Sequence, residues 1–278
     1  MTAISTATAG WLALRAPADD DARSADLAHD LARLIAPGSE SAPVVLHDLG
    51  AGTGSMTRWL APRLPGPQKW VLRDGDADIV EHLDLRTVLD AADCPITSDV
   101  VVEHLASLPL DAFRGAAAVT ASALLDVLTE AEAAHVVAAC VAAGTPALFS
   151  LSVTGSARLR PAERPDALER AIESAFNDHQ RRDASGRRML GPDAVPVVAG
   201  LFADAGWIVR TAATPWRLAH RETALIGEWL DGWIAAALEQ RPELASAAGE
   251  YRERRLAQAA GARLRVTVSH EDLLAWPR

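Results

Sequence analysis

Apolar and polar residues alternate along this chain with two different periods. Short apolar runs typical of buried strands are separated by stretches in which apolar residues recur every three or four positions, as in helices. The pattern predicts strands at 44–49, 70–72, 100–102, within 116–126, and at 146–153, 207–210 and 263–268. It predicts helices over 53–60, 77–85, 129–143, 167–178 and 192–205, and a helical stretch over 221–260. Strands that alternate with helices indicate an α/β fold, with a mostly parallel sheet covered by helices on both faces.

The first predicted strand runs directly into a glycine-rich turn, Gly50-Ala51-Gly52-Thr53-Gly54, which a helix follows. This order allows the backbone to approach a nucleotide-like ligand closely. A dinucleotide fingerprint would place its third small residue at position 55, but Ser55 stands there and the third glycine comes one position earlier. Asp48 precedes the turn, and its carboxylate would repel a pyrophosphate but attract an ammonium group. The turn therefore favours a ligand with a cationic amino-acid end.

The turn resembles the first motif of the class I S-adenosylmethionine-dependent methyltransferases, which is similar to D-x-G-x-G-x-G and is matched by Asp48, Gly50, Gly52 and Gly54. The resemblance implies a Rossmann-like sheet of seven strands with an antiparallel last strand, S-adenosyl-L-methionine as cofactor, and methyl transfer. Asp74, twenty residues beyond Gly54, is a second match. A carboxylate at the end of the second strand can accept bonds from both ribose hydroxyls. Asp76 is the alternative.

The resemblance also implies further cofactor contacts. His104 stands where the family commonly has an Asp that binds the adenine amino group, and Leu105 would offer its backbone N–H to the ring. Thr120 and Ser122 fall at the turn after the fourth strand, beside the methyl group that is transferred. Arg15 or Arg23, in the helical N-terminal segment, would bind the methionine carboxylate.

The acceptor site is predicted from the segments that interrupt the strand–helix rhythm. Residues 155–191 form an insertion of the kind that family members place over the acceptor pocket. His179 is the predicted general base, because an imidazole titrates near neutral pH. Gln180 beside it and Trp216, after the sixth strand, are predicted to bind substrate. The resemblance thus implies transfer of a methyl group to an oxygen or nitrogen of a small molecule by in-line displacement, with carbon less favoured.

We expect a single methyltransferase domain over 1–278. It comprises a helical N-terminal cap (1–41), a cofactor-binding half (42–154), the insertion (155–191) and a C-terminal half (192–278) that contains a helical insertion at 214–260.

Composition narrows the classes of partner. A net charge of −10, with a single strongly basic stretch at 180–188, disfavours nucleic acid, which needs a basic surface. No apolar run is long enough to span a bilayer, the N-terminus lacks a signal-peptide layout, and there are two cysteines, so a cytoplasmic protein is expected. Cys/His spacing indicates no metal site. The sequence does not decide whether the protein forms a homodimer. Three alternative functions also remain: an NAD(P)-dependent oxidoreductase, a methyltransferase of protein or RNA, and a non-enzymatic binder of S-adenosylmethionine.

Overall fold

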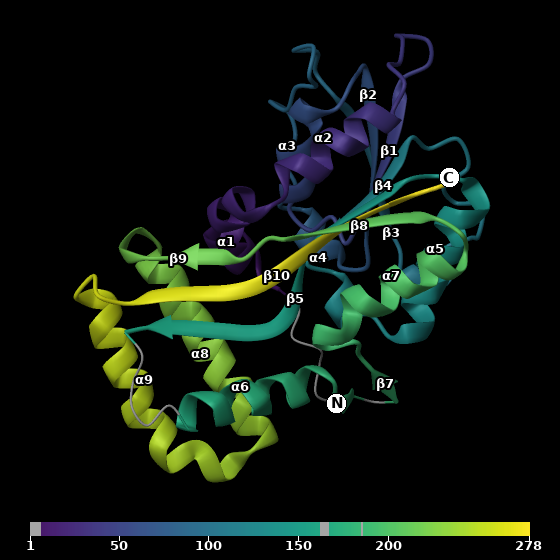
Figure 1. Cartoon of the computed structure of the whole chain (residues 1–278). Helices are drawn as coiled ribbons and strands as arrows, with labels where there is room; N and C mark the ends of the chain where they lie inside the picture. Colours follow the sequence, from purple (N-terminus) through teal and green to yellow (C-terminus); the bar gives the residue numbers. More distant parts are fainter. Residues whose placement is uncertain (1–6, 162–166, 185) are drawn as a thin grey trace.

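The computed structural model describes residues 7–161, 167–184 and 186–278, and it is built on one central sheet (Figure 1). The strand order is β3-β2-β1-β4-β5-β10-β8, with β9 paired to β10 beside this path. The strands are β1 (Val44–Leu49), β2 (Gln68–Asp74), β3 (Thr97–Val102), β4 (Ala118–Ser122), β5 (Ala147–Arg160), β8 (Ile208–Ala213), β9 (Trp216–Leu218) and β10 (Arg265–Trp276). The first five are parallel, and β10 is antiparallel to both of its long neighbours. The predicted fold class is therefore confirmed.

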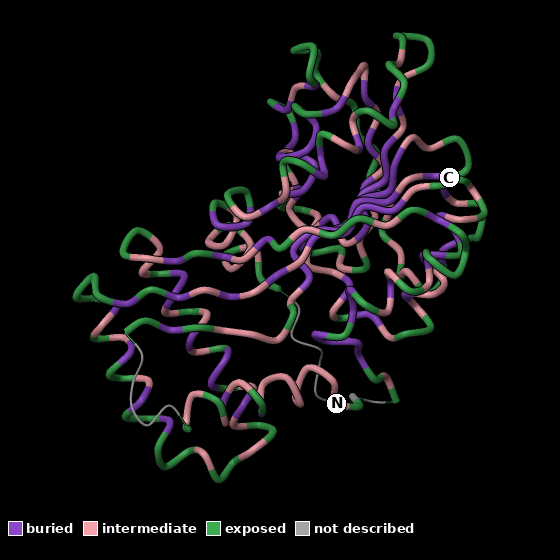
Figure 2. Tube along the Cα trace, in the orientation of Figure 1, coloured by how far each residue is buried: buried purple, intermediate pink, exposed green. Residues whose placement is uncertain are grey.

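Helices cover both faces of the sheet. They are α1 (Ala9–Ala22), α2 (Ala25–Leu34), α3 (Ser55–Leu60), α4 (Ala77–Val80), α5 (Glu130–Ala143), α6 (Ala167–Gln180), α7 (Ala194–Asp204), α8 (Thr223–Gln240) and α9 (Ala245–Ala260). Successive strand residues point to opposite faces, so Val119 and Phe149 pack with α5 and α7, whereas Ala118 and Leu148 pack with α2 and α3. Figure 2 shows the buried residues concentrated along these parallel strands.

A third apolar core lies beyond the parallel part of the sheet. Strands β5 and β10 stay paired far past their neighbours, and Figure 1 shows them running together to the region of α8 and α9. Their outer halves and β9 pack with α1, α6, α8 and α9 around buried residues such as Trp233 and Tyr251. The predicted ends of the fifth strand, at 153, and of the last strand, at 268, are therefore wrong. The missed end of β5 carries half-exposed polar residues, whereas the missed part of β10 pairs with β8 and carries the buried polar residues His270 and Asp272. Both features hide the continuation of the strands from a hydrophobic pattern.

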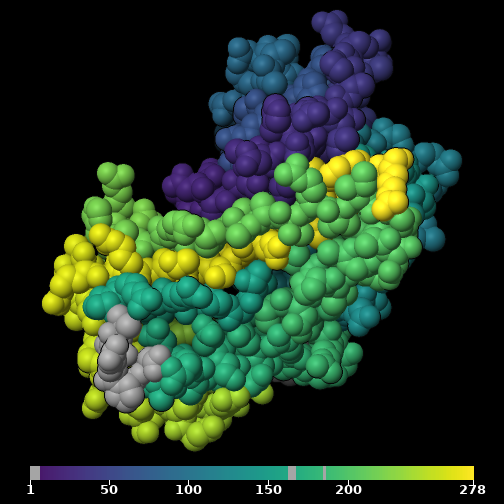
Figure 3. Space-filling view, in the orientation of Figure 1, coloured from purple at the N-terminus to yellow at the C-terminus, as the bar shows by residue number. Residues whose placement is uncertain are grey.

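The predicted N-terminal cap is present as α1 and α2. Figure 3 shows these helices, in purple, lying against segments from the C-terminal part of the chain, and α1 contacts β9. Residues 1–6 of the cap, and 162–166 and 185 of the predicted insertion, lie outside the described residues. Within the described part of the chain, no helix combines the length and apolar character that crossing a membrane requires.

Candidate functional site

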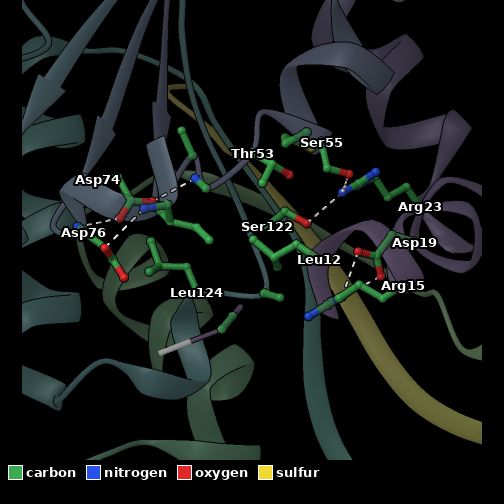
Figure 4. Close-up of a pocket in the computed structure, with 17 residues that line it drawn as sticks. Leu12, Arg15, Asp19, Arg23, Thr53, Ser55, Asp74, Asp76, Ser122 and Leu124 are labelled. Carbon is green, nitrogen blue, oxygen red and sulfur yellow. Dashed lines mark hydrogen bonds and ion pairs between the residues drawn. The ribbon is translucent and has the colours of Figure 1, made fainter. Parts of the chain in front are cut away.

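A cavity of about 230 Å³ lies at the carboxyl ends of β1, β2 and β4, beneath α1 (Figure 4). Its walls come from four segments: α1, the glycine turn, the turn after β2, and the turn after β4. They contribute Leu12, Arg15, Asp19 and Arg23; 50–53 with Ser55 and Met56; Asp74, Asp76 and Ile79; and 122–124. Crossover connections in a parallel sheet bring such turns together at one edge, which is where ligands of this fold class bind.

The glycine turn has a backbone that side chains would disrupt. Gly50, Gly52 and Gly54 have φ values of +61°, +53° and +81°, a region that residues with a Cβ rarely adopt. A Cβ on Gly50 would lie 3.0 Å from Leu124, and one on Gly52 would lie 3.2 Å from Leu12. The glycines therefore let the turn lie directly against both the β4 turn and α1. Gly54 itself does not line the cavity; its N–H closes the turn on Ala51 O at 2.8 Å.

Asp74 lies at the end of β2 and lines the cavity, as predicted. Its Oδ2 accepts the N–H of Gly52 at 2.8 Å, and its Oδ1 accepts the N–H of Asp76 at 2.9 Å. These bonds fix the carboxylate against the glycine turn. A carboxylate offers about four acceptor positions, so each oxygen keeps one for a ligand hydroxyl. Asp76 also lines the cavity, although its Oδ1 caps α4.

Asp48 does not line the cavity, and its contact with a ligand ammonium stays a prediction. The side chain is 0% exposed beneath the turn, where its oxygens accept the hydroxyls of Thr57 at 2.9 Å and Thr120 at 2.8 Å. Burial raises the pKa of Asp48 to about 6. Thr120, predicted to contact the cofactor, is likewise buried and bonded to Asp48. Both residues support the turn from below.

Arg15 lines the cavity from α1, where an ion pair and an indole orient it. Asp19 binds its Nε at 2.9 Å and its Nη2 at 3.1 Å, which leaves Nη1 for a ligand. Trp216 donates its indole N–H to the same Asp19 at 2.9 Å, and the Arg15 guanidinium lies 5.1 Å from the centre of the indole ring. Trp216 is only 3% exposed and does not line the cavity. The indole supports Arg15 through Asp19, and the role of Trp216 in substrate binding stays a prediction.

Arg23 is the second cation on this wall, and it is 4% exposed. Its Nη2 donates to the hydroxyls of Ser55 and Ser122, each at 3.1 Å, and its Nη1 pairs with Asp20 at 2.6 Å. Burial lowers the pKa of Arg23. The guanidinium thus joins the N-terminal cap to the glycine turn and to the β4 turn, and Ser122 lines the cavity as predicted.

The cavity has two chemically different ends. Figure 4 shows Asp74 and Asp76 on one side and Arg15 and Arg23 on the other, with Ser122 and the apolar Leu12 and Leu124 between them. One end offers hydrogen-bond acceptors to a ligand, and the other, where Asp19 pairs with Arg15, offers guanidinium donors to an anionic group.

Three predicted residues lie away from this cavity. His104 is exposed, and its Nδ1 lies within 3.0 Å of where a Cβ on Gly75 would stand; Leu105 packs partly against the core beside α5. Neither lines the cavity, and their adenine contacts stay a prediction. His179 does not line it either. Its Nε2 is 2.9 Å from Glu239 and its Nδ1 is 2.8 Å from Arg182, because α6 continues to Gln180 and turns this face toward α8.

The fold and the site together define a Rossmann-like α/β protein with a ligand cavity under an N-terminal helix. No protein-family model matches the sequence, and no curated protein matches it. Similar solved structures include a cyclopropane synthase from Mycobacterium tuberculosis, with 16% identity, a TM-score of 0.46, and 90% of this chain and 82% of that chain covered. Two others are described as S-adenosylmethionine-dependent methyltransferases in complex with S-adenosyl-L-homocysteine.

The first of these two, from Geobacter sulfurreducens, has 15% identity, a TM-score of 0.41 and 93% of each chain covered. The second, from Thiobacillus denitrificans, has 12% identity and a TM-score of 0.44, with 98% of this chain and 99% of that chain covered. The TM-scores are all below 0.5, so these similarities establish neither the activity nor the acceptor of this protein. Its function has to be argued from the residues of the site.

Proposed function

We propose that this protein is an S-adenosylmethionine-dependent methyltransferase that acts on an oxygen or nitrogen of a small molecule. The observation that carries the proposal is the division of one cavity into an acidic end, at Asp74, and an arginine end, at Arg15 and Arg23, across a glycine turn. S-adenosylmethionine has the matching groups: a ribose diol that donates hydrogen bonds, and an amino-acid carboxylate.

The residues fit this cofactor in separate ways. Each Asp74 oxygen has an acceptor position left for a ribose hydroxyl after its backbone bond. Arg15 presents Nη1 for a carboxylate, and a bond between charged partners of this kind is roughly twice as strong as a neutral one. The cofactor supplies a methyl group on a sulfonium sulfur, whereas the protein contributes orientation and a dry surrounding.

One contact disfavours the rival function of a nicotinamide-dependent oxidoreductase. In a dinucleotide fingerprint the glycine turn approaches the pyrophosphate, and its backbone N–H groups bind the phosphates. Here the Gly52 N–H is already donated to Asp74 at 2.8 Å. That carboxylate would also repel a pyrophosphate placed at the turn.

Two observations support a small acceptor. The cavity beneath α1 is small, about 230 Å³, which favours a small molecule at the cofactor-binding turn. The net charge of −10 opposes a nucleic acid as the acceptor.

Calorimetric titration tests the proposal. The purified protein is titrated with S-adenosylmethionine, S-adenosylhomocysteine and NADH, and we expect micromolar binding of the first two and none of NADH. Asp74→Asn keeps the shape of the side chain but converts one acceptor oxygen into a donor, so it serves as the site control. Binding of NADH alone would overturn the proposal.

A further inference from the structure

Several buried polar side-chain atoms lack a hydrogen-bond partner among the described residues. Four of them, in the segments 125–127, 147–160 and 167–180, are Asp126 Oδ1, Ser152 Oγ, Asn177 Oδ1 and Gln180 Oε1. Buried polar groups are almost always paired, because an unpaired one costs roughly 1–3 kcal/mol. Four such atoms on neighbouring segments are candidates for contacts with a ligand.

The four residues lie on elements that pack against one another. Asp126 is in the 3₁₀ turn η3 (Leu125–Val127), which contacts β5 and the turn η4 (Gly191–Asp193); α6 contacts β5 and η4 as well. The Asn177 amide donates to Gly155 O at 2.7 Å, and a Cβ on Gly191 would lie 3.0 Å from Gln180. Asp126, Asn177 and Gln180, each with one unpaired buried oxygen, form the orphan cluster.

Asp126 is the member of the orphan cluster that follows the cavity wall most closely along the chain, although none of the three residues lines the cavity itself. Leu124, two residues before Asp126, lines the cavity, and the positive charge of Arg15 acts on the Asp126 carboxylate. Burial raises the pKa of Asp126 above its ordinary value, which makes the carboxylate a better proton acceptor than an exposed aspartate. The other buried acids beside the cavity are engaged: Asp48 accepts two hydroxyls, and Asp19 accepts Arg15 and Trp216.

We propose that the orphan cluster binds the methyl acceptor and that Asp126 takes the proton from its nucleophilic atom. The proposal rests on the proposed function. The lone pair of the acceptor oxygen or nitrogen forms the bond to the methyl carbon, the sulfur keeps the electron pair of the broken S–C bond, and the proton of the acceptor passes to the Asp126 carboxylate. S-adenosylhomocysteine and the methylated acceptor are the products.

The cluster also defines the class of acceptor. Its three unpaired oxygens all accept hydrogen bonds, and one of them belongs to a carboxylate. The molecule that satisfies them carries several O–H or N–H donors and is neutral or cationic. A carboxylate or phosphate in the same place would add an acceptor and a like charge, so anionic acceptors are excluded.

The test compares three variants with the wild-type protein. Asp126→Asn keeps the shape and removes the charge, Gln180→Leu removes one acceptor at similar volume, and Glu130→Gln is an exposed control on the same connection. Calorimetry with S-adenosylmethionine comes first. Equal affinity in all four proteins separates this proposal from the proposed function, which fails if the wild-type protein does not bind the cofactor at all.

Acceptor probes are then added to protein loaded with S-adenosylhomocysteine and followed by NMR, and methyl transfer is measured with labelled S-adenosylmethionine. The probes are ethanolamine, glucosamine and catechol, with benzoate as the anionic probe. We expect binding and methylation of a donor-bearing probe, a loss of about 100-fold or more in kcat for Asp126→Asn, and a raised KM with little change in kcat for Gln180→Leu.

Thermal unfolding gives a readout without turnover. Because Asp126 holds an unpaired buried oxygen, Asp126→Asn should unfold at the same temperature as the wild-type protein or higher, as expected for a group retained for function. Wild-type transfer rates in Asp126→Asn with cofactor bound would overturn the proposal. Binding of benzoate alone, or of none of the donor-bearing probes, would overturn the assigned acceptor class.

Discussion

The buried carboxylate of Asp48 should make the stability of this protein fall as pH rises. Its pKa is about 6 in the folded protein because of burial, against an ordinary value of 3.8. A group whose folded pKa is raised binds more protons in the folded state, so it opposes folding increasingly above its unfolded pKa. The loss begins near pH 4 and is complete above pH 6.

The magnitude follows from the shift. Two pKa units correspond to about 3 kcal/mol at full development, at 1.36 kcal/mol for each unit. At pH 4.5 only about 1 kcal/mol of this loss has developed, and above pH 7 nearly all of it has. Asp48 alone should therefore lower the free energy of unfolding by about 2 kcal/mol between pH 4.5 and 7.5.

Asp48→Asn removes this titration with little change of shape. The Asn oxygen can still accept one hydroxyl, and the other hydroxyl can rotate to accept from the amide, because a threonine hydroxyl both donates and accepts. Urea unfolding of both proteins at pH 4.5 and 7.5 measures the difference. The variant should gain about 2 kcal/mol relative to wild type between the two pH values. Parallel pH dependences in the two proteins would refute the argument that Asp48 is buried as a destabilised carboxylate.

Three further predictions concern the cavity and its surroundings. Asp74→Asn should weaken S-adenosylmethionine binding by about 10-fold or more, since one ribose hydroxyl loses its charged acceptor; calorimetry that gives an unchanged Kd would place the ribose elsewhere. Gly52→Ala should abolish binding, because φ is +53° and the new Cβ would press on Leu12; Gly186→Ala, with open space around its Cβ, is the matched control. His179→Ala should change cofactor affinity and turnover by no more than about two-fold, because the ring does not line the cavity. The variant should have a lower thermal midpoint, because it loses the contacts of the ring with Glu239 and Arg182. A large drop in turnover would show that His179 takes part in the mechanism.

Features carried by local sequence were predictable. The glycine turn follows from its own spacing, because neighbouring residues along one strand–turn–helix unit fix it. The position of Asp74 at the end of the second strand follows from the resemblance to the family and the distance from Gly54. The helix from Thr129 is equally local: Thr129 and Glu132 form a reciprocal capping box, and Gly144 ends the helix with a φ of +66°.

Features that depend on distant segments were not predictable from the pattern. Trp216 donates to Asp19 across 197 positions, and Arg23 donates to Ser122 across 99. No sequence periodicity connects residues that are so far apart along the chain. Trp216 therefore looks like part of a binding surface, because its buried partner Asp19 is visible only in the structure. For a related reason, the sequence pattern does not distinguish Asp126. A single acid in a turn resembles any surface acid until its burial and missing partner are seen.

The N-terminal cap is attached to the sheet at Ser24, the residue that directly follows Arg23. Asp272 on β10 accepts the N–H of Ser24 at 2.9 Å, and its other oxygen accepts the N–H of Leu151 and the hydroxyl of Thr214, each at 2.7 Å. Leu151 has a φ of +58°, a costly conformation for a leucine that these contacts hold in place. Since Ser24 follows Arg23 directly, one buried carboxylate joins the cap, β5 and the segment after β8. The arginine end of the cavity is therefore positioned by the sheet itself, and a ligand meets Arg23 already oriented toward Ser55 and Ser122.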